Sequence, residues 1–427
     1  MQQDIDSKHL SDVFLGPAVS LLKQAKHTRS CPGLSDRLWL EMGVNRILAD
    51  VRSGRDFLQE WAMANGHEDA VGVSLFFETL KSSRRCHLIT ELNTQLAQSM
   101  ETHPDLEVDW KLLGELKKME VFAGDGHYHK ASVHDAPVEG KRRAVGHFYT
   151  LNLRTHALTH LEHSSLESLN KKADHDMAML KRLSVEQLRQ GVPVEHRGKK
   201  VMYVWDKAGI DLPQWDYWKT RAGIYFVSLC KENFDIEVSA ELDFDRSDSF
   251  NIGVVADELV STKSYGKPFR RIRYRCPQSG EAFEFMTNHM KIRPGVVAWL
   301  YKRRWDIEKT YDTFKNKLME KKAWAKSAVA KRMQAQFLCL AHNLIVQLEK
   351  YLREHHGIVD TQEALRSLKR IETNLKQTRK VRSPLYANPF KRSQLCLKFI
   401  RWLRHHLRYD EPLEESIGSL RIVYAVF

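Results

Sequence analysis

Cysteine is scarce in this 427-residue sequence, and the few cysteines are poorly placed for cross-linking. The six cysteines are far apart in the chain, and no two of them form a C-x-x-C pair. A disulfide framework or a cysteine-based zinc site is therefore not expected. We predict reduced, mostly buried thiols in a chain long enough for about two to four domains.

Long apolar runs are also missing. No stretch of about 18 consecutive apolar residues occurs, which argues against a membrane-spanning helix. The first residues, Met1 to Asp6, have neither the basic start nor the apolar stretch of a secretory signal. We therefore expect a protein that stays in the cytoplasm, or in the nucleoid within it, and that has no membrane partner.

Acidic residues are under-represented in the last third of the chain. Residues 291–427 hold 29 Lys and Arg against 13 Asp and Glu, whereas the residues before them are slightly acidic overall. A basic region of this size favours a polyanionic partner, because neutralising phosphates releases bound counterions. The alternative is that the charge serves solubility alone.

Residues 301–315 combine the kinds of side chain that meet a phosphate-bound metal ion. On a helix with about 100° per residue, Tyr301, Arg304, Glu308 and Lys315 fall within an arc of about 60°. One face would then carry a phenol, a carboxylate and two cations. The buried stripe of the same helix is predicted to be Ile307, Phe314 and Leu318. The alternative is a surface helix with an ion pair between Arg304 and Glu308.

These residues resemble the signature of insertion-sequence transposases of the DDE type, in the Tyr-Arg-Glu-Lys (YREK) subgroup. The resemblance rests on the four spaced residues, on the Arg-Trp-Asp-Ile-Glu core and on Phe-Met-Thr-Asn at 285–288. It implies an α/β fold with a ribonuclease-H-like mixed-sheet core, in which two aspartates and one glutamate hold divalent metal. Glu308 would be that glutamate, and Tyr301, Arg304 and Lys315 would bind DNA phosphates. The implied cofactor is Mg²⁺, with Mn²⁺ as a substitute.

The first aspartate is sought near residue 119, where the sequence period changes from helix to strand. A short apolar run from Met119 ends in Asp125-Gly126, and strand candidates follow at 144–153 and 157–161. The pattern predicts a three-stranded meander. Resemblance to the family makes Asp125 the first metal ligand, with Asp135 as its nearest rival. On the residues alone, an Asp-Gly pair is more often a turn.

His127 and His129 flank Tyr128 in a His-x-His arrangement. A zinc site needs more ligands than these two, and no third one stands at a usual spacing. We interpret both histidines as loop residues or phosphate contacts.

The second aspartate is sought after a fully apolar strand candidate. Residues 201–205 form such a run, and it ends at Asp206. Ligands cluster where buried strands of α/β sheets end, and Asp206 also matches the second aspartate of the family. The alternative is that Asp206 or Asp211 only caps a helix or a turn.

The remaining chain divides by pattern. We predict five parts: a helical N-terminal domain for end recognition or dimerisation (1–115), the first part of the catalytic core (116–230), a β-rich insertion (231–290), the catalytic helix (291–330) and a basic helical C-terminal region (331–427). An amphipathic helix is predicted at 174–190, and strands at 236–242, 250–255, 270–275 and 282–286. Residues 269–275 interleave cations with aromatics, which suits a surface that follows a DNA backbone. Phe283 matches loosely an aromatic on which relatives stack a flipped-out base, but a core phenylalanine is the simpler interpretation.

The resemblance implies a DNA transposase. Such an enzyme hydrolyses the phosphodiester at each transposon end and joins the exposed 3′-hydroxyl to target DNA, in many members through a hairpin. The expected partners are transposon-end inverted-repeat DNA, target DNA and a second copy of the chain. Two alternatives are a metal-dependent nuclease that cuts without joining and an inactive DNA-binding relative. Within the signature, Asp312 could replace or assist Glu308, whereas Asp306 points elsewhere.

Overall fold

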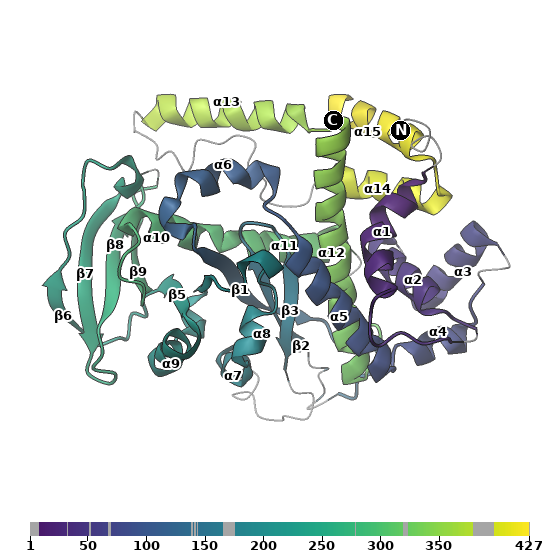
Figure 1. Ribbon diagram of the computed structural model, residues 1–427, viewed down its shortest axis with the longest axis horizontal. Coiled ribbons are helices and arrows are strands. Elements are labelled where there is room, and N and C mark those ends of the chain that lie inside the picture. The colour runs from purple at the N-terminus through teal and green to yellow at the C-terminus, as the bar shows by residue number, and fades with distance from the viewer. Residues whose placement is uncertain are drawn as a thin grey trace.

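The computed structural model describes residues 8–426 apart from short gaps at 32, 51–52, 67–69, 138–139, 141, 143, 165–175, 278, 319–322 and 379–396. In this part of the chain, nine strands form one mixed sheet in the order β3-β2-β1-β4-β5-β9-β8-β7-β6 (Figure 1). The strands are β1 (Met119–His129), β2 (Val145–Asn152), β3 (Leu158–His163), β4 (Lys200–Val204), β5 (Ile224–Leu229), β6 (Ile236–Glu241), β7 (Val254–Thr262), β8 (Phe269–Arg275) and β9 (Ala282–Thr287).

The predicted three-stranded meander is confirmed, because β1, β2 and β3 pair antiparallel in sequence order. β4 and β5 then add in parallel on the other side of β1. The strands β6 to β9 are all antiparallel, and β9 joins them to β5, so they extend the same sheet. The sheet is therefore mixed: β1, β4 and β5 run parallel to one another, and every other pair of neighbouring strands is antiparallel.

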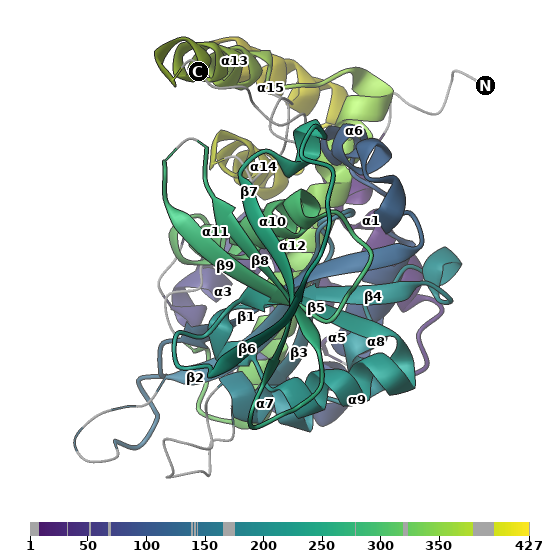
Figure 2. The same cartoon turned by 90° about the vertical axis from the view of Figure 1, so that its left-hand side faces the viewer.

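Helices cover both faces of the central strands (Figure 2). On one face lie α7 (Asp176–Arg182), α8 (Val185–Arg189) and α9 (Leu212–Ala222), which share a core with Val201, Tyr203 and Trp205 of the β4 region. On the other face lie α10 (Pro294–Arg303), α11 (Trp305–Asn316) and α12 (Ala328–His356), whose core includes Met202 and Val204. Side chains of β4 thus alternate between two cores, as a strand buried on both faces requires.

The helix α12 runs between the sheet and the N-terminal helices (Figure 1). Ser327 caps its start by accepting a hydrogen bond from the Ala330 amide, and Gly357, at a φ of 64°, ends it in the left-handed conformation. The helices beyond it are α1 (Leu10–Leu22), α2 (Asp36–Leu48), α3 (Gly54–Asn65), α4 (Val73–Thr79) and α5 (Ser83–Ser99), and α6 (Pro104–Leu112) leads on to β1. The N-terminal helices and the sheet contribute to one continuous apolar core through α12.

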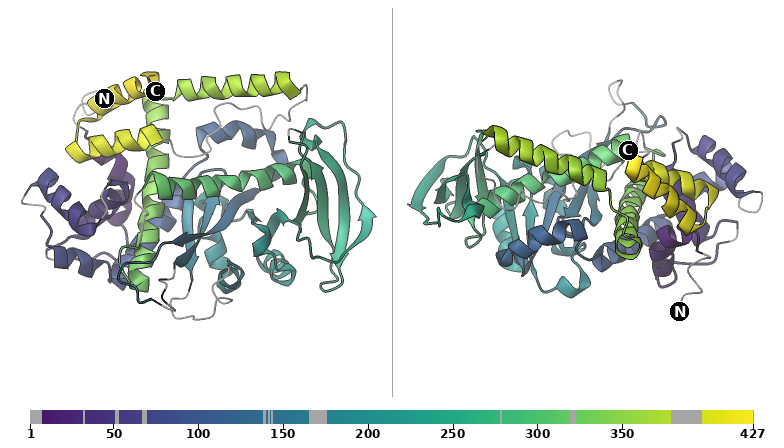
Figure 3. Two further views of the ribbon diagram at one scale, coloured as in Figure 1. Left: turned by 180° about the vertical axis from the view of Figure 1, so that it is seen from behind. Right: turned by 90° about the horizontal axis from the view of Figure 1, so that it is seen from above.

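Three basic or amphipathic helices complete the chain: α13 (Thr361–Thr378), α14 (Leu397–Tyr409) and α15 (Leu413–Val426). α13 extends along the top of the molecule toward the β6–β9 end (Figure 3). The predicted helical character of the region 331–427 is confirmed for its described residues by α12 to α15, and residues 379–396 lie outside the described part.

Two predicted elements differ from the structure. The single helix predicted at 174–190 is broken into α7 and α8, because Ser184 and Gln187 form a reciprocal capping box that starts a new helix; residues 174–175 are outside the described part. The strand predicted at 250–255 begins only at Val254, since residues 249–251 form a 3₁₀ turn.

None of the described cysteines forms a disulfide; Cys86 and Cys339 are buried, and the other three described thiols are only partly buried, so the expectation of buried thiols holds in full for two of the five. Cys396 lies outside the described residues. Among the helices that are described, none is both long and apolar enough to cross a membrane.

Candidate active site

Asp125 lies on β1, and Asp206 follows the end of the neighbouring parallel strand β4. The last aligned pair of β1 and β4 joins Ala123 to Val204, and each aspartate stands two residues beyond its member of that pair. Because side chains alternate along a strand, both aspartates share the face of Ala123 and Val204, the face covered by α10 to α12.

Asp125 is part of a strand and not of a turn. β1 continues through Gly126 to His129, held by antiparallel pairing with β2. The simple Asp-Gly turn is therefore excluded. Oδ1 of Asp125 accepts a hydrogen bond from the Gly126 amide at 2.9 Å, which leaves Oδ2 directed to other partners.

Asp206 has a local structural role as well. Its Oδ1 accepts a hydrogen bond from the Lys207 amide at 2.6 Å, at the start of the 3₁₀ turn Lys207–Gly209. The capping alternative is thus correct for one of its oxygens. Cap and ligand are compatible roles, because a carboxylate has two oxygens.

Arg304 joins the carboxylates of Asp125 and Glu308. Its Nη1 lies 3.4 Å from Oδ2 of Asp125 and 2.7 Å from Oε1 of Glu308. The distance between these two carboxylate oxygens therefore cannot exceed the sum of the two contact distances. The side chain of Arg304 is only 8% exposed, so its pair with Glu308 is not the solvent-exposed ion pair of a surface helix.

The charge of Asp206 acts on the same group. Burial would lower the pKa of Arg304, but Tyr301 together with Glu308, Asp125 and Asp206 raises it above its ordinary value. Burial also raises the pKa of Tyr301, whose ring lies 5.4 Å from the Arg304 guanidinium carbon. One buried cation thus contacts two of the predicted ligands, Asp125 and Glu308, lies near the predicted phenol and is influenced by the charge of the third ligand, Asp206.

The helix that carries the signature is not continuous. α10 ends at Arg303 and α11 begins at Trp305, with three-residue hydrogen bonds on both sides of Arg304, from its amide to Tyr301 and from the Ile307 amide to its carbonyl. The prediction of one regular helix over 301–315 was therefore wrong at Arg304. The apolar stripe of Ile307, Phe314 and Leu318 is confirmed as buried.

Lys315 does not join the group around Arg304. It is exposed, forms no ion pair with a described residue, and its charge acts on His129 farther along β1. A phosphate-binding role for Lys315 therefore stays a prediction.

The rival acids are engaged elsewhere. Asp135 pairs with the buried Lys331 of α12 at 2.9 Å. Asp306 is buried against Arg303, and Asp312 is exposed and accepts a hydrogen bond from Asn316 at 2.6 Å. None of the three contacts Arg304 in the described structure.

The donor chemistry of the site fits a hard divalent cation. Asp125, Asp206 and Glu308 offer carboxylate oxygens, which Mg²⁺ and Mn²⁺ prefer. A positive charge already lies among them, since the Arg304 guanidinium stands in for a cation. As the described side chains lie, no three acidic, histidine or cysteine residues converge closely enough to hold an ion. A metal ion would therefore require these carboxylates to turn away from Arg304.

Comparison with known families decides what kind of protein carries this site. Residues 79–344, more than half of the chain, match the family model described as the transposase DDE domain. The chain belongs to the transposase DDE domain family. The matched region runs from the end of α4 into α12 and contains every described strand of the sheet. A search of curated proteins found no match.

Sequence reasoning missed a buried histidine cluster in the transposase domain. His127 and His129 are buried in β1, at 3% and 2% exposure, so their interpretation as loop residues or phosphate contacts was wrong. His129 Nε2 lies 2.9 Å from the Tyr149 hydroxyl, and His147 Nδ1 lies 3.0 Å from His160 Nε2. The sequence contained a signal for this cluster, because the histidines recur at alternate positions of strand candidates that pair with one another.

These histidines predict acid sensitivity of folding. Burial, followed by repulsion from neighbouring cationic and histidine groups, holds the pKa values of His147 and His160 well below the ordinary 6.5. Below that ordinary value the unfolded chain binds protons that the folded chain does not, so stability falls as the pH falls. Each such histidine should lower the free energy of unfolding by about 1.4 kcal/mol for each pH unit below that value.

The measurement is the free energy of unfolding between pH 6.5 and 5 for the wild type and for His147→Gln. We expect the free energy of unfolding of His147→Gln to fall less steeply with falling pH than that of the wild type, whatever the stability of the variant at pH 7. His134→Gln, which changes an exposed histidine, should keep the wild-type slope. Equal slopes in all three proteins would contradict the conclusion that burial of His147 makes folding sensitive to acid.

The cationic strand β8 is mostly neutralised. Arg270 is buried and ion-paired with Asp257, and Arg271 and Arg273 both pair with Glu258 at 2.7 and 3.0 Å. The prediction of a DNA-tracking surface over 269–275 was therefore wrong for Arg270, which is buried, and stays a prediction for Arg273 and Arg275, which are exposed.

Phe283 is half-buried, and its ring stacks on Phe285 with centroids 5.8 Å apart. This packing agrees with the simpler interpretation of Phe283 as part of the core.

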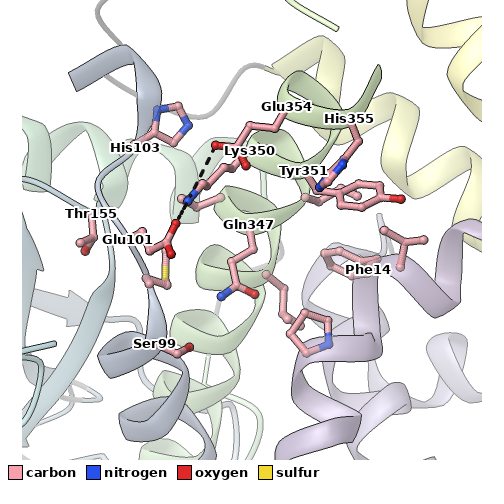
Figure 4. Close-up of a pocket in the computed structure, with 16 residues that line it drawn as sticks. Phe14, Ser99, Glu101, His103, Thr155, Gln347, Lys350, Tyr351, Glu354 and His355 are labelled. Carbon is pink, nitrogen blue, oxygen red and sulfur yellow. Dashed lines mark hydrogen bonds and ion pairs between the residues drawn. The ribbon is translucent and has the colours of Figure 1, made fainter. Parts of the chain in front are cut away.

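A cavity of about 270 Å³ lies apart from this site, between α1, the segment after α5 and α12 (Figure 4). Lys350 points across it to Glu101, at 2.5 Å. Neither the three carboxylates nor Arg304 lines it, so the transposase site is not this cavity.

Proposed function

We propose that this transposase cuts phosphodiester bonds at transposon ends by two-metal hydrolysis and joins the 3′ ends to target DNA. The observation that carries the proposal is the contact of the buried Arg304 with the carboxylates of both Asp125 and Glu308, and the charge of Asp206, at the end of the neighbouring strand, also acts on this guanidinium. The order β3-β2-β1-β4-β5, with helices on both faces, further supports a ribonuclease-H-like core, and β6 to β9 would be the subgroup's insertion.

The three carboxylates would hold a pair of Mg²⁺ ions, or Mn²⁺ in their place. When bound, such a pair supplies charge stabilisation at both the attacking and the leaving oxygen of the phosphodiester. The protein's own contribution is to position the ligands on or directly after rigid elements: Asp125 on β1, Asp206 just after β4, and Glu308 on α11, which packs against β1. Rigid elements hold such ligands more accurately than loops do.

The cations beside the carboxylates would receive the DNA backbone. Arg304 is held within reach of the scissile region and presents a planar fork suited to phosphate oxygens. Tyr301 would donate a hydrogen bond to a neighbouring phosphate, and the exposed Lys315 would contact the backbone along α11. With these roles the chain would belong to the YREK subgroup.

The remaining parts would serve synapsis. We assign end recognition or dimerisation to the N-terminal helices (1–115) and backbone binding to the basic region 331–427. A homodimer is expected because two transposon ends must be joined. Cut-and-paste transfer through hairpin ends is the route proposed.

The test is an assay with purified protein, Mg²⁺, linear DNA that ends in the inverted repeats flanking its gene, and a supercoiled target plasmid. We expect 3′ nicking at the repeat, end hairpins and joined plasmid products. Cutting without joined products would favour a nuclease, and binding without cutting in either Mg²⁺ or Mn²⁺ would favour an inactive relative.

A further inference from the structure

Tyr311 links the helix of Glu308 to the strand of Asp125. Tyr311 stands on α11 one turn after Glu308, and its hydroxyl donates a hydrogen bond to the backbone carbonyl of Asp125 at 2.6 Å. The phenol is only 6% exposed, so water competes little for this bond.

The strand needs such a contact at this position. β4 ends at Val204, opposite Ala123, and beyond that pair β1 has lost its parallel neighbour. From Gly124 to His129 the strand is paired only with β2. Asp125 therefore lies on a segment supported by the sheet along one side alone, and Tyr311 supplies a fixed contact from the helix layer.

The phenol itself is held in place by its neighbours. The ring of His127 stacks on Tyr311 with centroids 4.6 Å apart and an interplanar angle of 19°. Tyr149 and Phe314 pack around the same ring at 5.8 and 6.2 Å. A ring so enclosed has little freedom to turn, and its hydroxyl direction is set by packing.

We propose that Tyr311 is a positioning residue that sets the separation of Asp125 and Glu308 and thereby the affinity of the site for divalent metal. The proposal rests on the proposed function, because it takes these two carboxylates as ligands. Tyr311 acts through the backbone of Asp125 and touches neither metal nor DNA. Its loss should therefore weaken metal binding without changing DNA affinity.

The test compares Tyr311→Phe with Tyr149→Phe. Tyr149→Phe is the matched control because it also removes one buried hydroxyl from the same aromatic cluster, where the hydroxyl lies 2.9 Å from His129. Mn²⁺ binding is measured by calorimetry without DNA, and cleavage is measured as a function of Mg²⁺ concentration. Melting temperature and end-DNA affinity in Ca²⁺ are measured alongside.

We expect Tyr311→Phe to weaken Mn²⁺ binding, and to raise the Mg²⁺ concentration for half-maximal cleavage, by about tenfold, as loss of a supporting contact does at other metal sites. Tyr149→Phe should leave both quantities within about twofold of wild type. The inference would be overturned if Tyr311→Phe kept wild-type Mn²⁺ affinity and Mg²⁺ requirement. It would also be overturned if both variants lost metal affinity equally and in proportion to their loss of melting temperature.

Failure of the proposed function has a different signature. If Glu308→Gln binds Mn²⁺ as tightly as wild type, the ligand assignment is wrong and the inference falls with it. If Glu308→Gln loses Mn²⁺ binding while Tyr311→Phe keeps it, the inference alone is overturned.

Discussion

Glu308→Gln is expected to abolish DNA cleavage and to leave binding of end DNA nearly unchanged. Glutamine keeps the shape of the side chain and can still accept a hydrogen bond from Arg304, but it loses the anionic oxygen offered to metal. The loss of about 4 kcal/mol of transition-state stabilisation corresponds to a rate lower by about 10³-fold. The measurement is the single-turnover rate of nicking at saturating Mg²⁺, with duplex binding measured in Ca²⁺.

Asp312→Asn provides the matched control for this change. It removes the same charge from the same helix, one turn farther on, from an exposed carboxylate whose described partner is Asn316. We expect it to cut at close to the wild-type rate. The opposite pattern, with an inactive Asp312→Asn and an active Glu308→Gln, would make Asp312 the ligand.

Gly124→Ala is expected to disturb both aspartates at once. A Cβ at Gly124 would lie 2.0 Å from Cζ3 of Trp205, whose indole is fully buried. Gly124 immediately precedes Asp125, and Trp205 immediately precedes Asp206, so relief of this clash must move one ligand or both. We expect destabilisation of about 1–3 kcal/mol, typical of overpacking, and cleavage slower by about 10²-fold from misplacement.

The measurements are chemical denaturation and nicking rate. Gly146→Ala is the control on the neighbouring strand β2, because its added carbon would meet the exposed ring of Tyr128 at 3.0 Å and the Met179 methyl group at 3.5 Å, an ordinary contact distance. Adding Trp205→Phe to Gly124→Ala removes the outer indole ring and should restore part of the rate. Wild-type cleavage by Gly124→Ala would show that both strand ends can shift without loss of activity, and that the close packing of Gly124 on Trp205 does not position the aspartates.

The sequence predicted the strands that carry the aspartates because their signals are local. An apolar run that ends abruptly at an acidic residue, as residues 201–206 do, marks the end of its strand in the sequence itself. Burial of Ile307 and Phe314 was predictable for the same reason, since helical period is a property of neighbouring residues. Family resemblance was needed to choose Asp125 over Asp135, because an Asp-Gly pair alone favours a turn.

What could not be predicted depends on contacts between distant segments. β1 was expected to end at Asp125, but pairing with β2 carries it on to His129 and buries two histidines. Arg270 was expected at a surface, but Asp257, on the neighbouring strand, neutralises it. The break at Arg304 was not predictable either, because an ideal helical projection assumes one continuous helix.

Asp125, Asp206 and Glu308 should bind divalent metal together, and anomalous diffraction from crystals grown with end DNA and Mn²⁺ would locate that metal directly. We expect anomalous peaks within about 2.1 Å of carboxylate oxygens from Asp125 and Asp206, with Glu308 completing the site after Arg304 has turned toward the DNA. Strong Mn²⁺ peaks held by other residues, with Arg304 still between Asp125 and Glu308, would contradict the assignment of these three ligands.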